Sequence, residues 1–124
     1  MKFKKPIIVF DFDGVIHSYT SGWKGHAVIP DPPVKGIKEV IDKVRKDYKV
    51  VVVSSRCNET TGLLAIKAYL KKHNIKVDYV TNGKPPAVMY IDDRGICFDG
   101  NAEHLLHQIE NFEPWQNKVG DKDD

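Results

Sequence analysis

Short apolar runs alternate along the chain with stretches in which apolar residues recur every three or four positions. Two of the runs, "PIIVF" at 6–10 and "KVVVV" at 49–53, are unbroken, which is typical of strands buried on both faces of a sheet. Between them, residues 34–48 predict a helix with Lys and Glu placed among the members of one apolar stripe, which are Ile37, Val40, Ile41 and Val44.

The rest of the chain continues this alternation. Residues 58–73 predict a second helix, with Asn58 as a candidate N-cap and an apolar stripe of Leu63, Ile66 and Leu70. Short strands are predicted at 77–80 and 88–91, and "GICF" at 95–98 is a candidate for a brief final strand. A last helix over 101–112 is expected to face inward through Leu105, Leu106, Ile109 and Phe112. The tail at 113–124 carries a Pro, a Gly and a charged end, and we expect it to be flexible.

Strand, helix, strand, helix, strand is the order of a parallel sheet with right-handed crossovers. The pattern therefore predicts an α/β fold with a three-layer, Rossmann-like parallel sheet. A length of 124 residues fits one domain, which we expect to occupy residues 1–112.

The composition of the chain limits the kinds of partner and the cellular location that we expect. The 19 basic and 17 acidic residues give a net charge of +2, which does not support a broad nucleic-acid-binding surface and leaves nucleic acid only as a substrate. No apolar run is long enough to span a membrane. Cys57 and Cys97 are far apart in the sequence, and we expect two reduced, small buried thiols in a cytoplasmic protein.

Polar residues follow the predicted strands at the points where the strands end. Because ligands bind at the carboxyl ends of strands in parallel sheets, we expect these side chains to converge on one rim. They are Asp11 and Asp13 after the first strand, Ser54, Ser55 and Arg56 after the second, and Asp92, Asp93 and Arg94 after the fourth, with Lys84 shortly before the fourth.

Asp11 and Asp13 stand two positions apart in "VFDFDGV". On a regular strand both side chains would point to the same side, and two ionised carboxylates so close together need a positive charge between them. A turn at Gly14 can instead splay the two side chains apart.

This set of residues is suited to phosphoryl transfer. The two acidic clusters offer the oxygen ligands that Mg²⁺ prefers, Ser54 can bind phosphate oxygens, and Lys84 can neutralise charge on the phosphate. No His or Cys spacing indicates zinc, and no Gly-rich Walker loop is present in the sequence. The nucleophile is therefore expected to be an Asp or a Ser, and an Asp beside Mg²⁺ and Lys can form an aspartyl-phosphate.

Taken in order, "DFDGV", "VVVSSR", "GKPPA" and "YIDDR" resemble the four motifs of the haloacid dehalogenase-like (HAD) phosphohydrolases, over residues 7–101. The resemblance implies that Asp11 is the nucleophile and that Asp13 is the general acid/base and gives its backbone carbonyl to the metal. It also implies that Ser54 and Lys84 bind the phosphoryl group, and that Asp92 and Asp93 complete the Mg²⁺ site. As a proton donor near neutral pH, Asp13 is expected to have a raised pKa.

Neither gap between the motifs is long enough for the separate cap domain that many HAD relatives carry, so the chain resembles the capless branch. Such relatives act on large substrates or borrow a neighbouring subunit as cover, and a homo-oligomer is one expectation. Residues 15–33 are expected to form a β-hairpin flap. Within this flap Trp23 either stacks on substrate or packs against its own loop, and His17 and His26 are expected to be ordinary surface residues.

Ser55, Arg56 and Arg94 adjoin the motifs and are candidate substrate contacts, although Arg56 can equally serve a structural ion pair. The substrate is expected to be a small phosphorylated metabolite, such as a nucleotide or sugar phosphate, or a phosphorylated macromolecule. Two other interpretations remain: a receiver-like phosphoacceptor module and a non-catalytic phosphate-binding domain. The receiver is disfavoured by the order of the motifs, because the short third strand ends in "TNG" and not in an Asp.

Overall fold

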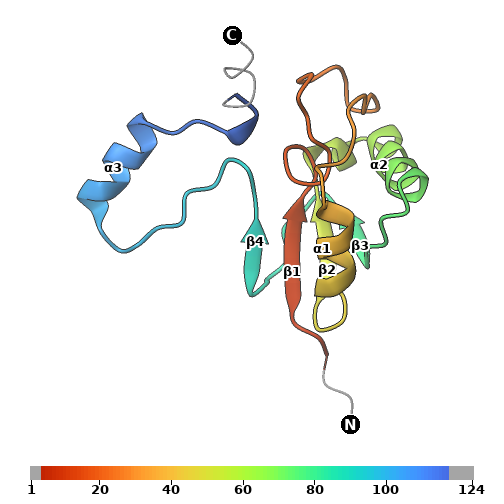
Figure 1. Ribbon diagram of the computed structural model, residues 1–124, viewed down its shortest axis with the longest axis horizontal. Helices are drawn as coiled ribbons and strands as arrows, with labels where there is room; N and C mark the ends of the chain where they lie inside the picture. The colour runs from red at the N-terminus through yellow and green to blue at the C-terminus, as the bar shows by residue number, and fades with distance from the viewer. Residues whose placement is uncertain (1–3, 118–124) are drawn as a thin grey trace.

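The computed structural model describes residues 4–117. Parallel strands alternate with helices up to the third strand, and a last helix follows the fourth (Figure 1). The elements are β1 (Ile7–Asp11), α1 (Ile37–Val44), β2 (Lys49–Val53), the short 3₁₀ helix η1 (Ser55–Asn58), α2 (Thr60–Lys72), β3 (Tyr79–Thr81), β4 (Met89–Ile91) and α3 (Ala102–Glu110).

The four strands form one sheet in the order β3-β2-β1-β4, and every pair is parallel. The fold is therefore α/β and is consistent with a three-layer, Rossmann-like fold, which confirms the predicted fold class. Because β1 has β2 on one side and β4 on the other, the carboxyl ends of these three strands lie next to one another at one edge of the sheet. No helix among the described residues is long and apolar enough to cross a membrane.

The main core lies between one face of the sheet and the helices α1 and α2. Alternate residues of β1 and β2 point into it, and they meet fully buried Ile41 of α1 and Ile66 of α2. Burying one such side chain contributes about 1.5–3 kcal/mol, so this face supplies most of the apolar stabilisation. The other face holds a smaller cluster of Val9, Val51 and Val53, against which Ile7 and Ala87 pack.

Helix α3 lies away from the sheet, to the left in Figure 1, and none of its residues is buried. Of the residues expected to face inward, Leu105 is half-buried, and Leu106, Ile109 and Phe112 are exposed. That expectation was wrong because the residues that follow β4 lead the chain away from the sheet, while Ala87 from the loop before β4 packs on the second face. An apolar stripe predicts a helix, but it does not specify what the stripe will contact.

Four other expectations differ from the structure. "GICF" forms no strand, because residues 95–98 belong to the connection that leads out to α3. The flap at 15–33 is an irregular loop with isolated bridges Asp13–His17 and His17–Pro33, not a regular hairpin. Helix α1 begins three residues later than predicted, since the Val34 amide donates to Ile16 in the flap. Residues 55–58 form η1 and not the start of α2, so Asn58 is not the N-cap of α2.

Candidate active site

The residues at the strand ends do converge. A cavity of about 230 Å³ is lined by eight side chains from five segments of the chain: Asp11, Asp13, Tyr19, Trp23, Ser54, Ser55, Asp93 and Arg94. Larger hollows of about 700 and 400 Å³ lie beside α2 and on the second face of the sheet, but neither contains a strand-end acid of the predicted set. The small cavity is therefore the candidate active site.

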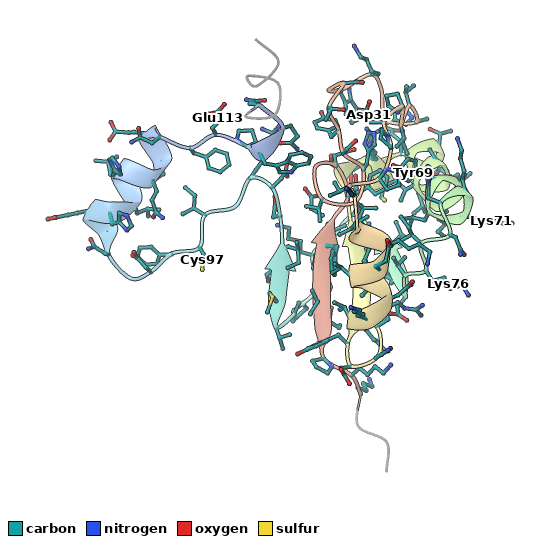
Figure 2. The ribbon with its side chains drawn as sticks, viewed as in Figure 1. Asp31, Tyr69, Lys71, Lys76, Cys97 and Glu113 are labelled. Carbon is teal, nitrogen blue, oxygen red and sulfur yellow. The ribbon has the colours of Figure 1, made fainter. Side chains whose placement is uncertain are left out.

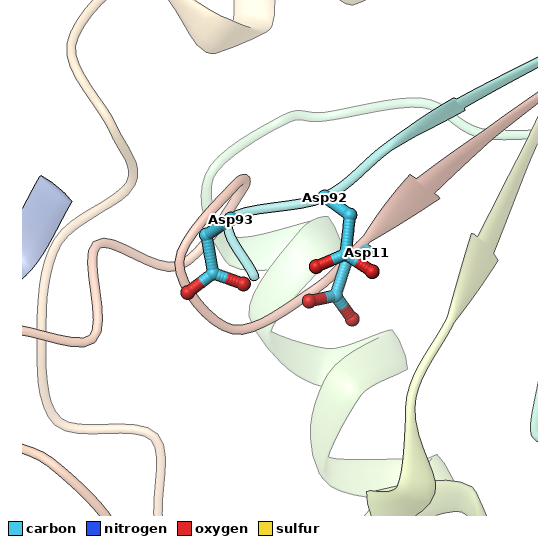
Figure 3. Close-up of side chains that lie close together, drawn as sticks. All are labelled: Asp11, Asp92 and Asp93. Carbon is cyan, nitrogen blue, oxygen red and sulfur yellow. The ribbon is translucent and has the colours of Figure 1, made fainter. Parts of the chain in front are cut away.

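Asp11, Asp92 and Asp93 form a tight acidic cluster (Figure 3). One carboxylate oxygen from each lies within 4.8 Å of the others, which is the spacing at which one cation can be shared. Burial and the negative charges of Asp92 and Asp93 raise the pKa of Asp11 from 3.8 to about 7. Burial and the approach of the other two carboxylates therefore both disfavour the ionised form of Asp11.

Two basic side chains border the acidic cluster. Lys84 Nζ lies 3.5 Å from an Asp92 oxygen, and Arg94 Nε lies 3.8 Å from an Asp93 oxygen. Both side chains are more than half exposed, so neither contact contributes much to folding stability.

Asp13 points away from the acidic cluster and into the flap. The chain turns sharply after Asp11, because the carbonyl of fully buried Phe12 accepts the amides of residues 15–17 and Gly14 has a φ of 86°. His17 Nδ1 lies 2.8 Å from Asp13 Oδ1, and Arg56 Nε donates to Asp13 Oδ2 at 2.8 Å. The turn therefore splays the two acids apart, which is the second of the two arrangements expected from the sequence.

The contacts around Asp13 also set its acidity. Burial acts to raise the pKa of this carboxyl, but the hydrogen bonds from His17 and Arg56 outweigh it and hold the pKa below its usual value. The expectation of a raised pKa was therefore wrong. It failed because the two donors come from residues that sequence reasoning did not pair with Asp13.

His17 is fully buried, so its assignment as a surface residue was also wrong. The backbone amide of Asp31 donates to Nε2 at 3.1 Å, so Nδ1 carries the proton that is shared with Asp13. Asp31 Oδ2 lies 3.6 Å from the same Nε2, but this nitrogen already accepts the amide proton, and we do not count the approach as an ion pair. Asp31 is itself held by the Ser21 amide and by Tyr69, whose hydroxyl donates to the Asp31 carbonyl (Figure 2).

Arg56 is almost completely buried and joins the flap to Asp13. Its Nη1 donates to three flap carbonyls, those of Gly25, His26 and Val28, and its guanidinium lies 4.7 Å from the centre of the Trp23 ring. Of the two roles predicted for Arg56, the structure shows the ion pair. Trp23 packs on Arg56 yet stays about half exposed and lines the cavity, so it remains a candidate substrate contact.

Ser54 and Ser55 close the cavity floor at the start of η1. Buried Ser54 accepts a hydrogen bond from the Arg56 amide, which leaves its hydroxyl proton available to a ligand, and Ser55 is exposed. Helix α2 approaches this turn very closely, since a Cβ at Gly62 would lie 2.0 Å from the Arg56 carbonyl oxygen. Gly62 therefore allows α2 to hold η1 in place.

Two contacts come from beyond the expected catalytic domain. Trp115 donates to the Gly14 carbonyl, and Gln116 donates to Asp93, both at 2.6 Å. Residues 115 and 116 belong to the tail that was expected to be flexible, and residues 118–124 lie outside the described residues. A Trp and a Gln after a Pro carry no motif, and only the folded chain brings them to the site.

Comparison by sequence finds no matching protein family and no similar curated protein. Among solved structures, the fold is similar to a chain of the Pnkp1/Rnl/Hen1 RNA repair complex, with a TM-score of 0.52 and 17% identity. The match covers 88% of this chain and 33% of that chain, so this protein spans about a third of the length of that neighbour. Likeness at this identity supports the fold alone.

Proposed function

We propose that the protein is a Mg²⁺-dependent phosphomonoester hydrolase of the HAD type, with Asp11 as nucleophile and Asp13 as general acid/base. The observation that carries the proposal is the meeting of Asp11 with Asp92 and Asp93 at the edge of a cavity that Asp13 and Ser54 also line. An isolated Asp-x-Asp pair would be weak support. Acids from two strand ends, gathered beside a serine and a lysine, support phosphoryl transfer much more strongly.

The residues present fit a hard divalent cation. Three carboxylates within 4.8 Å supply oxygen ligands, and burial together with the negative charges of Asp92 and Asp93 raises the pKa of Asp11 to about 7. Asp11, Asp92 and Asp93 would hold Mg²⁺, together with the Asp13 carbonyl that the motif implies. When bound, the ion would screen the charge that Asp11 and the phosphate bring together.

The chemistry of the chain itself follows in two steps. A carboxylate oxygen of Asp11 attacks phosphorus, the bond from phosphorus to the leaving oxygen breaks, and that oxygen takes a proton from Asp13. Water then attacks the aspartyl-phosphate while Asp13 takes up its proton, which releases phosphate and restores both carboxyl groups. In the free protein the lowered pKa keeps Asp13 ionised, so it must gain its proton as the negatively charged substrate enters.

The shape of the site bears on the substrate. The cavity of about 230 Å³ is smaller than the pockets that usually enclose a whole small-molecule ligand, and no cap domain covers it among residues 4–117. The remainder of the substrate therefore lies over Trp23 and Arg94 or outside the protein, which suits a small metabolite or the end of a macromolecule. Because the structural neighbour belongs to an RNA repair complex, phosphorylated nucleic-acid ends belong among the substrates tested.

Two further proposals concern the cellular location and the oligomeric state of the protein. Cys57 and Cys97 are both free thiols, which supports the cytoplasmic location that we propose. A second subunit as cover for the open site is the corresponding proposal for oligomeric state.

The proposal is tested by phosphate release from p-nitrophenyl phosphate and from a panel of nucleotides, sugar phosphates, phosphopeptides and 3′- or 5′-phosphorylated oligonucleotides. EDTA should abolish release and Mg²⁺ should restore it. Asp11→Asn should lower turnover by about 10⁴-fold or more, because it removes the nucleophile. The matched control is Asp47→Asn, an exposed residue in the turn after α1.

Four outcomes would contradict the proposal. Full turnover in EDTA would overturn the metal requirement, and unchanged turnover in Asp11→Asn would overturn the nucleophile. A stable phosphoprotein with no phosphate release would favour the receiver-like alternative, whereas phosphate binding without any chemistry would favour the non-catalytic one.

A further inference from the structure

After α3 the chain returns to the candidate site through residues 113–116, here called the return segment. In Figure 1 the chain leaves the sheet at the top of β4, runs out to α3 and comes back above β1 and β4. Trp115 Nε1 donates to the Gly14 carbonyl and Gln116 Nε2 donates to Asp93 Oδ2, each at 2.6 Å. The chain that leaves the sheet toward α3 therefore returns and contacts two residues of the site, Gly14 and Asp93.

The contact point is packed so closely that it dictates the residue at position 14. A Cβ on Gly14 would lie 2.1 Å from Asp93 Oδ2 and 2.3 Å from Gln116 Nε2, and the φ of 86° also favours glycine. Three segments distant in sequence therefore meet at one point. The Asp93 carboxylate lies between Gly14 and Gln116 and has little freedom to turn.

Burial distinguishes Asp93 from its neighbour Asp92. The Asp93 side chain is 2% exposed, whereas that of Asp92 is 26% exposed. A buried carboxylate needs hydrogen-bond donors in place of water, and the Gln116 amide supplies one with good geometry. The Oε1 atom of Gln116 is also buried and has no hydrogen-bond partner among the described residues, so this amide is held at the site through its nitrogen.

We propose that Gln116 is a positioning residue that fixes the Asp93 carboxylate for cation binding, with Trp115 anchoring the return segment. The inference rests on the proposed function, since it assumes that Asp93 is a ligand. Hydrogen bonds that orient a metal-binding carboxylate typically affect affinity by about 10–100-fold. The four motifs end near Arg94, so nothing in them assigns a role to residues 115 and 116.

The test is direct titration with Mn²⁺, followed by the electron paramagnetic resonance signal of the free ion, which needs no turnover. Gln116→Leu keeps the size of the side chain but removes its donor, and it should weaken Mn²⁺ binding about tenfold or more. Trp115→Phe keeps an aromatic ring but removes the indole donor, and it should weaken binding less. Gln108→Leu on α3 is the matched control and should bind Mn²⁺ as the wild type does.

A second measurement shows whether the return segment is docked. With ¹⁵N-labelled protein, the indole N–H of Trp115, assigned by its loss in Trp115→Phe, should be protected from hydrogen exchange in the wild type and in Gln108→Leu. A rapidly exchanging indole in the wild type would overturn the anchoring role of Trp115.

The results separate this inference from the proposed function. If the wild type binds Mn²⁺ and Gln116→Leu binds it equally well, the inference fails and the metal site stands. The inference also fails if Gln108→Leu weakens binding as much as Gln116→Leu does. If the wild type binds no Mn²⁺, the metal site and the inference fail together.

Discussion

The candidate site has two walls that are built in different ways. The flap wall consists of Asp13, His17 and Arg56, and its side chains are bound to one another or to the flap backbone. The acidic wall consists of Asp11, Asp92, Asp93 and Lys84, and it brings three carboxylates together with two largely exposed basic side chains, Lys84 and Arg94, at its border. The flap wall pairs its acid with buried donors, whereas the acidic wall concentrates negative charge.

The difference follows from where each wall lies in the fold. The flap wall extends the main core, because Phe12 packs there beside His17 and Tyr69 of α2. The acidic wall includes the end of β4, an edge strand of three residues whose Met89 and Tyr90 are about half exposed. Fully buried Arg56 is paired with Asp13 in the flap wall. In the acidic wall, buried Asp93 accepts a hydrogen bond from Gln116, while Asp92 is more exposed. Under the proposed function, the acid/base is held before substrate arrives, and the return segment adjusts the affinity for the cation.

The largest predicted effect is a loss of turnover on replacing Asp13, and it tests the role of the flap wall. Asp13→Asn should lower turnover of an alkyl phosphate by about 10²–10⁴-fold, because an alkoxide needs a proton to leave. Release of the leaving group from p-nitrophenyl phosphate should be slowed much less, since that phenolate leaves without one, whereas hydrolysis of the aspartyl-phosphate is common to both substrates. Single-turnover rates of leaving-group release check this, with exposed Asp99→Asn as control, and equal losses on both substrates would contradict the acid role.

A second prediction compares one arginine from each side of the site. Arg56→Ala leaves Asp13 and three flap carbonyls without their donor, and should lower the free energy of unfolding by about 3–5 kcal/mol. Arg94→Ala removes a largely exposed side chain 3.8 Å from Asp93 and should change it by less than about 1 kcal/mol. Urea unfolding measures both. Similar costs at the two positions would contradict the contrast between the walls.

The smallest expected effect is on the pH dependence of stability in EDTA. With its pKa raised to about 7, Asp11 binds a proton in the folded state that the unfolded chain releases above about pH 4. Its contribution to stability is therefore complete below about pH 4 and is lost as the pH rises through 7. Asp13, with a lowered pKa, behaves oppositely, and its contribution is lost only as the pH falls through its folded-state pKa.

Urea midpoints measured from pH 3 to 8 test this assignment. Asp11→Asn should remove the decline between about pH 4 and 7 and keep the loss on the acid side. Saturating Mg²⁺ should also remove the decline, because it favours ionised Asp11. A decline that persists in Asp11→Asn would assign it to another group.

The sequence predicted the parts of the fold and site that depend on local pattern. Unbroken apolar runs located β1 and β2, and the rule that ligands meet strand ends brought Asp11, Ser54 and Asp93 to one cavity. His17 was missed because its burial depends on packing against Phe12 and Tyr69, which no local period encodes. A weak signal was present, since His17 follows the apolar pair Val15 and Ile16 and lies four residues after Asp13.

The sequence also could not predict the surroundings of α3 or the contacts of the return segment, because both depend on residues far apart in the chain. The stripe of α3 was read correctly as helical, but its environment depends on the path of the chain after β4. The contacts of Trp115 and Gln116 join residues 101 and 23 positions apart, and nothing near them in the sequence indicates their partners.

The three flap carbonyls bound by Arg56 link the flap to the protonation of Asp13. The same guanidinium donates to Asp13 and, together with His17, holds the pKa of that carboxyl low. Any displacement of the flap from Arg56 would therefore also change the proton affinity of Asp13.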